Sequence, residues 1–246
     1  MLLDGRHILV TGAARGLGAE IARGLAAQGA RLILADIAEE EGRATAGALG
    51  ATFARVDLAD PASVEALAAA VAAATGGALH GLVNNGAIAT GIGGIGFEDI
   101  EIESWDRVQR VNVRGTWLMT RAAAPLLRAS GSGRVVNVAS DTALWGAPNL
   151  MSYVASKGAV IAMTRSLARE LGPDRVGVTA VAPGILTTES TEYVPPARHR
   201  FYEDGRAVPG AQGPGEITDV VAFLLSEGAL TLTGQLLPVN NGFVFT

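Results

Sequence analysis

Short apolar runs alternate along the chain with alanine-rich stretches whose apolar residues recur at helical spacing. The apolar runs predict strands that are buried on both faces, and the helical spacing predicts amphipathic helices. Strands are expected within 7–12, 31–36, 51–60, 79–87, 133–140, 177–184 and 233–243. Helices are expected within 17–30, 39–50, 61–77, 104–130, 150–171 and 216–229.

This alternation predicts parallel strands joined by right-handed crossovers, and therefore a doubly wound α/β sheet in three layers. No linker or repeat divides the chain, so 1–246 is expected to form a single domain. Residues 186–215 break the pattern, because they are irregular and rich in Pro, Gly and charged residues. Segments of that length usually serve function, so 186–215 is predicted to be a substrate-binding loop or lid.

Composition narrows the functional classes. The net charge is −5 and no basic block is visible, which argues against a nucleic-acid partner. The chain has no cysteine, which excludes disulfides and cysteine metal sites, and no metal site is predicted. No run of about 18 apolar residues lacks charges or turn residues, and the N-terminus lacks the features of a secretory signal. We therefore expect a cytoplasmic protein that does not span a membrane.

A glycine-rich turn follows the first predicted strand. Its glycines, Gly12, Gly16 and Gly18, would let the backbone approach a pyrophosphate at a helix N-terminus. On the glycines alone, a tight turn without a ligand remains an alternative. Asp36 ends the second predicted strand, where an acid can accept hydrogen bonds from both ribose hydroxyls of NAD. Arg15 is placed to contact the 2′-phosphate of NADP, but Asp36 would repel that phosphate and favours NAD.

The chain holds a single lysine among 19 basic residues, and this Lys157 follows Tyr153 by four positions. On a helix this spacing puts both side chains on one face. An ammonium beside a phenol favours the phenolate and lowers the phenol pKa toward neutrality. Such a phenol can take a proton from an alcohol or give one to a carbonyl oxygen. Lysine suits this task better than arginine, because it is a compact charge with three donors.

Two further polar residues occupy notable positions. Ser140 ends a predicted strand, where its hydroxyl would stabilise charge on a reacting oxygen or would simply begin a turn. Asn112 lies in an otherwise apolar helical stretch, where its amide competes for backbone groups. Either a functional contact or a satisfied helix kink would explain Asn112.

The pattern of these motifs resembles the short-chain dehydrogenase/reductase family in its single-domain branch. The resemblance covers nearly the whole chain and implies a Rossmann-type fold with a seven-stranded parallel sheet. It rests on "TGAARGLG" (11–18), Asp36, "VDL" (56–58), "NNGA" (84–87), Asn112, Ser140, "YVASK" (153–157) and "APG" (182–184) followed by Thr187.

The resemblance implies a role for each matching residue. Tyr153 would be the catalytic acid/base, Lys157 would lower its pKa and bind the nicotinamide ribose, and Ser140 would orient the substrate oxygen. Asn112 would hold a water that links Lys157 to solvent. The expected cofactor contacts, those argued above included, are Gly12, Arg15, Gly16, Leu17, Gly18, Asp36, Asp57, Leu58, Asn84, Gly86, Tyr153, Lys157, Pro183, Gly184, Ile185 and Thr187.

The chain departs from the family pattern at two places. The family usually has Asn-Asn-Ala-Gly, whereas Gly86 precedes Ala87 here, so the position that needs a glycine for backbone shape is expected to hold Ala87. The stretch "VNNGF" (239–243) stands where the family often shows two glycines after Asn.

Substrate contacts are expected after Ser140, within 87–97 and in the 186–215 loop. The candidates are Asp141, Leu144, Trp145 and Tyr193. Their character suggests a ketone or secondary alcohol with an apolar or ring-shaped group, although packing within a lid explains them equally well. Asp141 would either bind a hydroxylated substrate or cap a turn.

The predicted activity is the reversible, NAD-dependent oxidation of a secondary alcohol to a ketone. One alternative is a 3-oxoacyl-carrier-protein reductase, which would favour NADPH and would need a basic patch such as Arg107, Arg110 and Arg114. Another alternative is a protein that binds NAD without chemistry. By the family resemblance, the helices at 104–130 and 150–171 would pair across subunits in a homotetramer.

Overall fold

The strands of the chain form one parallel sheet. The protein, described by a computed structural model, is defined over residues 1–246 apart from the side chain of Ser190. Within the described chain the sheet has seven strands in the order β3-β2-β1-β4-β5-β6-β7. The strands are β1 His7–Thr11, β2 Arg31–Asp36, β3 Thr52–Arg55, β4 Gly81–Asn84, β5 Arg134–Val138, β6 Gly177–Pro183 and β7 Leu236–Val239. Every expected strand is therefore present, and several are shorter than the apolar run that predicted them.

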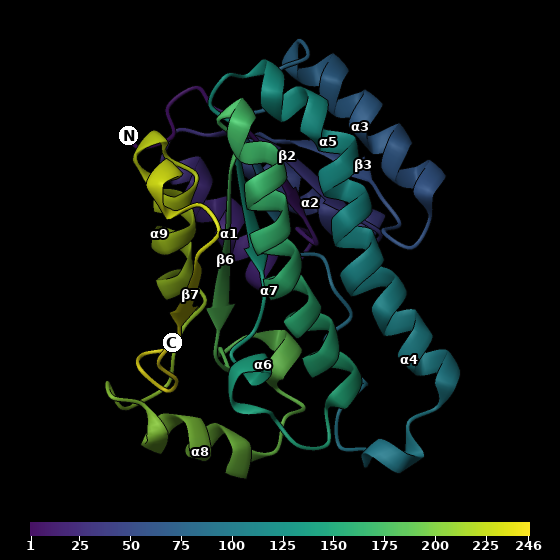
Figure 1. Ribbon diagram of the computed structural model, residues 1–246, viewed down its shortest axis with the longest axis vertical. Coiled ribbons are helices and arrows are strands. Elements are labelled where there is room, and N and C mark those ends of the chain that lie inside the picture. Colours follow the sequence, from purple (N-terminus) through teal and green to yellow (C-terminus); the bar gives the residue numbers. More distant parts are fainter.

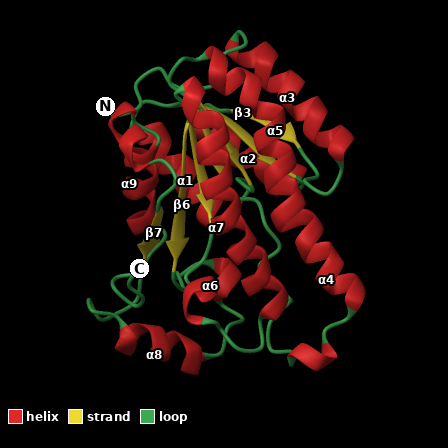
Figure 2. Cartoon of the chain, in the orientation of Figure 1, coloured by secondary structure: helices red, strands yellow, loops and turns green.

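Helices cover both faces of the sheet, which gives the three layers expected (Figures 1 and 2). On one face lie α1 Gly16–Ala27, α2 Glu39–Leu49 and α9 Gly215–Leu224. On the other lie α3 Pro61–Thr75, α4 Ile102–Gln109, α5 Thr116–Ala129 and α7 Met151–Leu171. Ile21 and Ile217 pack with Val10 in the first core, and Leu67 and Met119 lie in the second. The doubly wound, single-domain Rossmann architecture is confirmed.

The expected helix at 104–130 is interrupted at its centre. Residues Arg110–Gly115 form a π-helical turn between α4 and α5. The buried side chain of Asn112 explains the interruption, because it accepts a hydrogen bond from the Ile88 N–H at 2.7 Å and donates to the Ile88 carbonyl at 3.0 Å. Such bulges commonly mark functional sites.

Residues 186–215 are less irregular than their composition suggests. They contain α8, Pro196–Gly205, which lies beside the C-terminal loop (Figure 1). A four-residue helix, α6 Thr142–Trp145, follows β5. Both helices lie at the carboxyl ends of the strands. None of the helices in the described chain is long and apolar enough to cross a membrane.

Candidate active site

A large cavity opens at the carboxyl ends of the strands. Its volume is about 1130 Å³, and its wall includes the residues that follow β1, β2, β4, β5 and β6. Strands β1 and β4 are neighbours in the sheet although they are separated in the chain, so the strand order reverses at this point. Doubly wound sheets bind their ligands at such reversals.

The glycine turn is shaped by contacts that only glycine permits. Gly12 has φ +65°, and a Cβ there would lie 2.6 Å from the Cα of Gly86. A Cβ on Gly18 would lie 2.0 Å from the Gly12 carbonyl oxygen. The backbone of this turn therefore lines the cavity bare of side chains, as a pyrophosphate requires. The structure thus offers a cradle that fits a dinucleotide.

Asp36 is oriented by two backbone N–H groups, one from the glycine turn after β1 and one from the segment that follows β2. Its Oδ2 accepts a hydrogen bond from the Ala14 N–H at 2.9 Å, and its Oδ1 accepts one from the Ala38 N–H at 3.0 Å. Each carboxylate oxygen keeps a further lone pair, and Asp36 lines the cavity. The group is therefore held ready to accept hydrogen bonds from two adjacent hydroxyls.

The "NNGA" segment lies differently from expectation. Asn84 is buried outside the cavity wall and donates to Thr120 and Asn137, whereas Asn85 lines the cavity and donates to the Gly12 carbonyl at 2.9 Å. The sequence reasoning missed Asn85. Ala87 does not have a positive φ, so that position does not need a glycine. The expectation for Ala87 was wrong, because the close approach to Gly12 is made by Gly86.

Most other expected cofactor contacts also line the cavity. These are Arg15, Gly16, Leu17, Asp57, Leu58, Pro183, Gly184 and Ile185. Thr187 does not line it, and its N–H is bonded to the Gln212 carbonyl at 2.8 Å. Its neighbours Leu186 and Thr188 are part of the wall.

Ser140, Tyr153 and Lys157 meet in the same cavity. Ser140 ends the β5 segment, whereas Tyr153 and Lys157 share one face of α7. The Lys157 ammonium is buried and donates to the Val138 carbonyl at 2.6 Å, and it lies 5.6 Å from the centre of the Tyr153 ring. The Ser140 hydroxyl accepts a hydrogen bond from the Thr142 hydroxyl at 2.9 Å.

Burial is the main cause of the shifted pKa values of Tyr153 and Lys157. It raises the pKa of Tyr153 to about 12, although the hydrogen bond with Ser140 lowers it in part. Burial also lowers the pKa of Lys157 to about 8. In this structure burial raises the pKa of Tyr153 above its ordinary value, and the Lys157 ammonium is directed at the Val138 carbonyl. At neutral pH the tyrosine is therefore protonated and is set to donate. That Lys157 lowers the pKa of Tyr153 stays a prediction.

Asn112 lies behind this site and outside its wall. Besides its two bonds to Ile88, its amide donates to the Ser156 hydroxyl at 3.1 Å. Ile88 lines the cavity and Ser156 precedes Lys157 in α7. Asn112 thus ties the segment after β4 to the helix that carries the tyrosine and the lysine.

Asp141 does not line the cavity. It is fully buried, its Oδ1 accepts from the Tyr202 hydroxyl at 2.8 Å, and its Oδ2 accepts from the Asn240 amide at 3.1 Å. Burial raises the pKa of Asp141 to about 6, although these hydrogen bonds lower it in part. Its side chain neither reaches the cavity wall nor makes a capping hydrogen bond to α6, so the structure supports neither expected role. It joins the end of β5 to α8 and to the C-terminal loop.

Leu144 and Trp145 also lie outside the wall. Trp145 donates to the Tyr202 hydroxyl at 3.0 Å and packs in an aromatic cluster with Phe201, Tyr202 and Phe243. Tyr193 does line the cavity, and it donates to the Ala89 carbonyl at 2.9 Å. Sequence reasoning missed the contribution of α8, which places Ala197, Arg198 and Tyr202 in the wall. The four-residue spacing of Arg198 and Tyr202, which puts both side chains on one face of a helix, is the sequence pattern that could have indicated α8.

The fold and sequence have clear relatives. Residues 12–244 match the family model described as Enoyl-(Acyl carrier protein) reductase. A 3-alpha-(or 20-beta)-hydroxysteroid dehydrogenase of Mycobacterium tuberculosis is 36% identical over 98% of this chain and 90% of its own length. A trans-4-hydroxycyclohexanecarboxylate dehydrogenase of Sinomonas cyclohexanicum is 36% identical over 95% of this chain and 91% of its own length.

A solved structure shares the fold closely. The 3-ketoacyl-(acyl-carrier-protein) reductase from Brucella melitensis, complexed with NADH, has a TM-score of 0.91 to this chain at 31% identity. The match covers 98% of this chain and 99% of that one. The similarity therefore includes both the cofactor turn and the segment from β6 to β7.

Proposed function

The chain belongs to the short-chain dehydrogenase/reductase family, and we propose that it oxidises a secondary alcohol to a ketone with NAD. Its relatives establish an oxidoreductase that acts on CH–OH groups with a nicotinamide cofactor. One observation carries the finer proposal. Ser140, Tyr153 and Lys157 line the same cavity as the bare glycine turn, so a hydride carrier and a proton donor would meet there.

The residues divide the work between binding and proton transfer. The glycine turn, Asp36 and the 183–185 segment would hold the cofactor, which when bound supplies or accepts the hydride. Tyr153 would give a proton to the carbonyl oxygen, or take one from the hydroxyl. Ser140 would hydrogen-bond that oxygen and stabilise its developing charge. The Lys157 ammonium would favour the charged form of the tyrosine when a proton leaves.

The pKa of Tyr153 gives the two directions different pH dependence. Reduction needs a protonated Tyr153 and oxidation needs it deprotonated. Because burial raises the pKa of Tyr153 to about 12, the small deprotonated fraction grows from pH 7 to pH 10 while the protonated fraction hardly changes. We expect the rate of alcohol oxidation to rise over this range and the rate of ketone reduction to change little on account of Tyr153.

Asp36 supports NAD over NADP, because a carboxylate held by two backbone N–H groups would repel a 2′-phosphate. A 3-oxoacyl-carrier-protein reductase remains the second candidate. It is favoured by the Brucella melitensis structure and by Arg107, which lies in the cavity wall. The alicyclic hydroxy acid named for the Sinomonas relative is a further candidate substrate class.

The remaining proposals concern assembly and closure. A hollow near α4, α5 and α7 is lined by apolar residues and by both polar and charged ones, namely Asp106, Gln109, Arg110, Val113, Arg114, Trp117 and Met163. We propose that this face pairs with another subunit in a homotetramer, which sedimentation velocity would test.

Residues 186–215 act as the lid, supported by the Tyr193–Ala89 hydrogen bond across the cavity. The cytoplasmic location stays a prediction.

Tyr153→Phe is the decisive test of the chemistry. The change removes one oxygen and is expected to lower kcat by about 10²- to 10⁴-fold, the usual contribution of a general acid/base. The assay is absorbance at 340 nm with NAD or NADP and a panel of aryl, alicyclic and polyol alcohols. An acetoacetyl thioester with NADH or NADPH tests the second candidate.

The outcomes are distinct. Retention of most activity by Y153F would contradict the assignment of the proton donor. A faster reaction of the thioester with NADPH would favour the second candidate. Thermal shift with NAD shows whether the variant still folds and binds the cofactor, which is expected because the hydroxyl is not part of the glycine cradle.

A further inference from the structure

The substrate half of the cavity contains an arginine whose charge is not compensated. Arg198 lies in the first turn of α8, is half-buried and lines the cavity. Among the described residues its guanidinium forms no ion pair and no hydrogen bond. Other arginines near the cavity differ. Arg206 donates to the Gly210 and Ile185 carbonyls, and Arg15 pairs with Glu189 at 3.5 Å.

The Arg198 guanidinium lies over an aromatic ring. Its central carbon lies 5.2 Å from the centre of the Trp145 ring. Stacking of this kind uses the flat face of a guanidinium and leaves its N–H edges available for two parallel hydrogen bonds. Trp145 is in turn held by its bond to Tyr202. The ring therefore positions the guanidinium without using its donors.

Helix stability does not account for an arginine at this position. The first turn of a helix favours acidic residues, because its free N–H groups carry partial positive charge. The first turn of α8 contains no acidic residue. Arg198 thus adds positive charge where the helix already has it.

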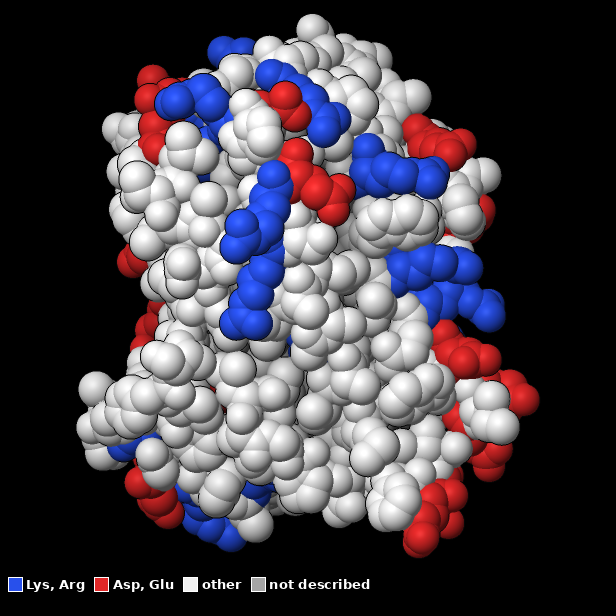
Figure 3. Space-filling view, viewed as in Figure 1, with Lys and Arg blue, Asp and Glu red and all other residues white. Residues whose placement is uncertain are grey.

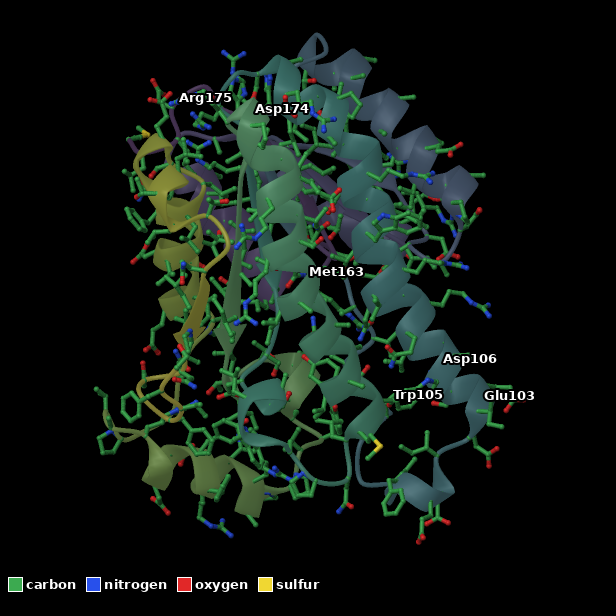
Figure 4. All side chains as sticks on the ribbon, in the orientation of Figure 1. Glu103, Trp105, Asp106, Met163, Asp174 and Arg175 are labelled. Atoms are coloured by element: carbon green, nitrogen blue, oxygen red, sulfur yellow. The ribbon has the colours of Figure 1, made fainter. Side chains whose placement is uncertain are left out.

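The charges around the cavity are separated. The acidic residues of its wall are Asp36 and Asp57, which follow β2 and β3 in the adenosine half. The segments 88–94, 147–150 and 193–198, which form the other half, contribute none. The other cationic residues of the wall are Arg15, Arg107 and Lys157. Glu103 and Asp106, which are near Arg107 in the chain, lie at the outer edge of α4 (Figure 4). Acidic residues on this view gather at the same outer edge (Figure 3).

Asp141 does not neutralise Arg198. It is fully buried, and its two oxygens are occupied by Tyr202 and Asn240. Within the described residues the substrate half therefore presents positive charge to whatever enters.

We propose that Arg198 binds an anionic oxygen group of the substrate, so that the enzyme prefers hydroxy or oxo compounds that carry such a group away from the reacting carbon. The proposal rests on the proposed oxidoreductase function. A planar carboxylate matches the guanidinium fork, and a phosphate presents the same chemistry. The carboxylate of a hydroxy acid and the phosphate of a carrier-linked thioester are the two sources to be distinguished.

The test compares an acid with its neutral analogue. The wild-type protein with NAD would receive 4-hydroxycyclohexanecarboxylate and the matching carboxamide. Because hydrogen bonds to charged groups contribute about 1.5–3 kcal/mol, kcat/KM for the acid is expected to exceed that for the amide by about 10- to 100-fold. Acetoacetyl-CoA and the N-acetylcysteamine thioester, which has no phosphate, form the second pair.

Arg198→Gln should abolish this preference. We expect the acid-to-amide ratio of kcat/KM to fall by at least about tenfold, mainly through KM. Arg198→Lys, which keeps the charge but not the fork, should retain part of it. Arg200→Gln is the matched control, because Arg200 is exposed on α8 and outside the cavity wall. If R198Q fails to fold, R198K decides the comparison.

Equal turnover of acid and amide by the wild-type protein, together with equal turnover of the two thioesters, would overturn the proposal and leave the oxidoreductase function intact. The proposal would also be overturned if R198Q lowered kcat/KM equally for the charged and the neutral member of a pair, because an equal loss indicates that the substitution disturbs packing and not the binding of an anion. If the wild-type protein prefers acetoacetyl-CoA over the N-acetylcysteamine thioester but does not prefer the acid over the amide, the anion that Arg198 binds is a phosphate. If none of these compounds reacts, thermal shift with the acid and NADH decides, and binding that R198Q does not weaken overturns the proposal.

Discussion

The two halves of the cavity are built in different ways. The cofactor half is formed by backbone at the ends of neighbouring strands, where a Cβ on Gly18 would lie 2.0 Å from the Gly12 carbonyl oxygen. The substrate half is formed by side chains from segments far apart in the chain, as in the bond between Asp141 and Asn240, which are 99 positions apart.

This difference explains what each half can tolerate. Backbone contacts at the glycine turn leave no room for side chains, whatever ligand is bound. The substrate half is joined by hydrogen bonds and ring contacts through Tyr202, which bonds to Asp141 and stacks on Phe243 at 4.3 Å. Changes there can move α8 and alter selectivity while the cofactor site stays intact.

Gly18→Ala should produce the largest effect. The added Cβ would overlap the Gly12 carbonyl, so the turn must move. We expect NAD to bind about a hundredfold more weakly, because a shift of about 1 Å in the turn would misplace the backbone that contacts the cofactor. Overpacking should also lower the free energy of unfolding by about 1–3 kcal/mol. Calorimetric titration with NAD and urea unfolding measure the two effects.

Gly47→Ala is the matched control in α2, where a Cβ would meet no atom within 4 Å. Removing a helical glycine there should raise the free energy of unfolding by up to about 1 kcal/mol. NAD affinity should not change. Normal NAD binding by G18A would show that the turn adapts, and the contrast between the halves would lose its basis.

The cofactor half was predictable from the sequence for this physical reason. Strand, glycine turn and helix follow one another in the chain, so local spacing carries the geometry. The seven strands followed from apolar runs in the same way. What failed was the choice between adjacent residues, as with Asn84 and Asn85, because the direction of a side chain at a strand end depends on the pleat and on Thr120 and Asn137.

The substrate half was not predictable from local patterns. Trp145 looked like a substrate contact, yet it packs against Phe201 and Phe243, which come from other segments of the chain. Asp141 was expected to bind a hydroxylated substrate or to cap a turn, yet it is buried and bonded to Tyr202 and Asn240. The helix α8 was hidden by the Pro, Gly and charged residues around it. These outcomes depend on tertiary contacts that no short window of sequence contains.

Asp141→Asn should show how the buried carboxylate affects stability. Its pKa is raised from 3.8 to about 6 by burial, so the folded protein holds this proton more tightly than the unfolded chain. The contribution of Asp141 to stability therefore falls as pH rises from about 4 to about 6, by about 3 kcal/mol. The free energy of unfolding of D141N minus that of wild type should rise by that order between pH 4 and pH 7.

Urea unfolding at several pH values measures this difference directly. Asp174→Asn is the matched control, because Asp174 pairs with Arg128 at the surface. Its difference from wild type should change by less than about 1 kcal/mol over the same range. A flat difference for D141N would mean that the carboxylate is solvated, and that α8 is not anchored to β5 as the structure has it.

Ala87→Gly should have the smallest effect, and it tests whether the swapped pair at 86 and 87 matters. Because Ala87 does not have a positive φ, a glycine gains nothing there and should cost only about 0.5–1 kcal/mol of stability through chain entropy. NAD affinity should stay within about twofold of wild type, since the Cα that approaches Gly12 belongs to Gly86. Gly86→Ala is the contrasting variant, because its Cβ would lie 2.7 Å from a Leu58 methyl group and 3.2 Å from the Gly12 nitrogen. It should weaken NAD binding more than A87G does, and the reverse order would place the requirement for glycine at 87.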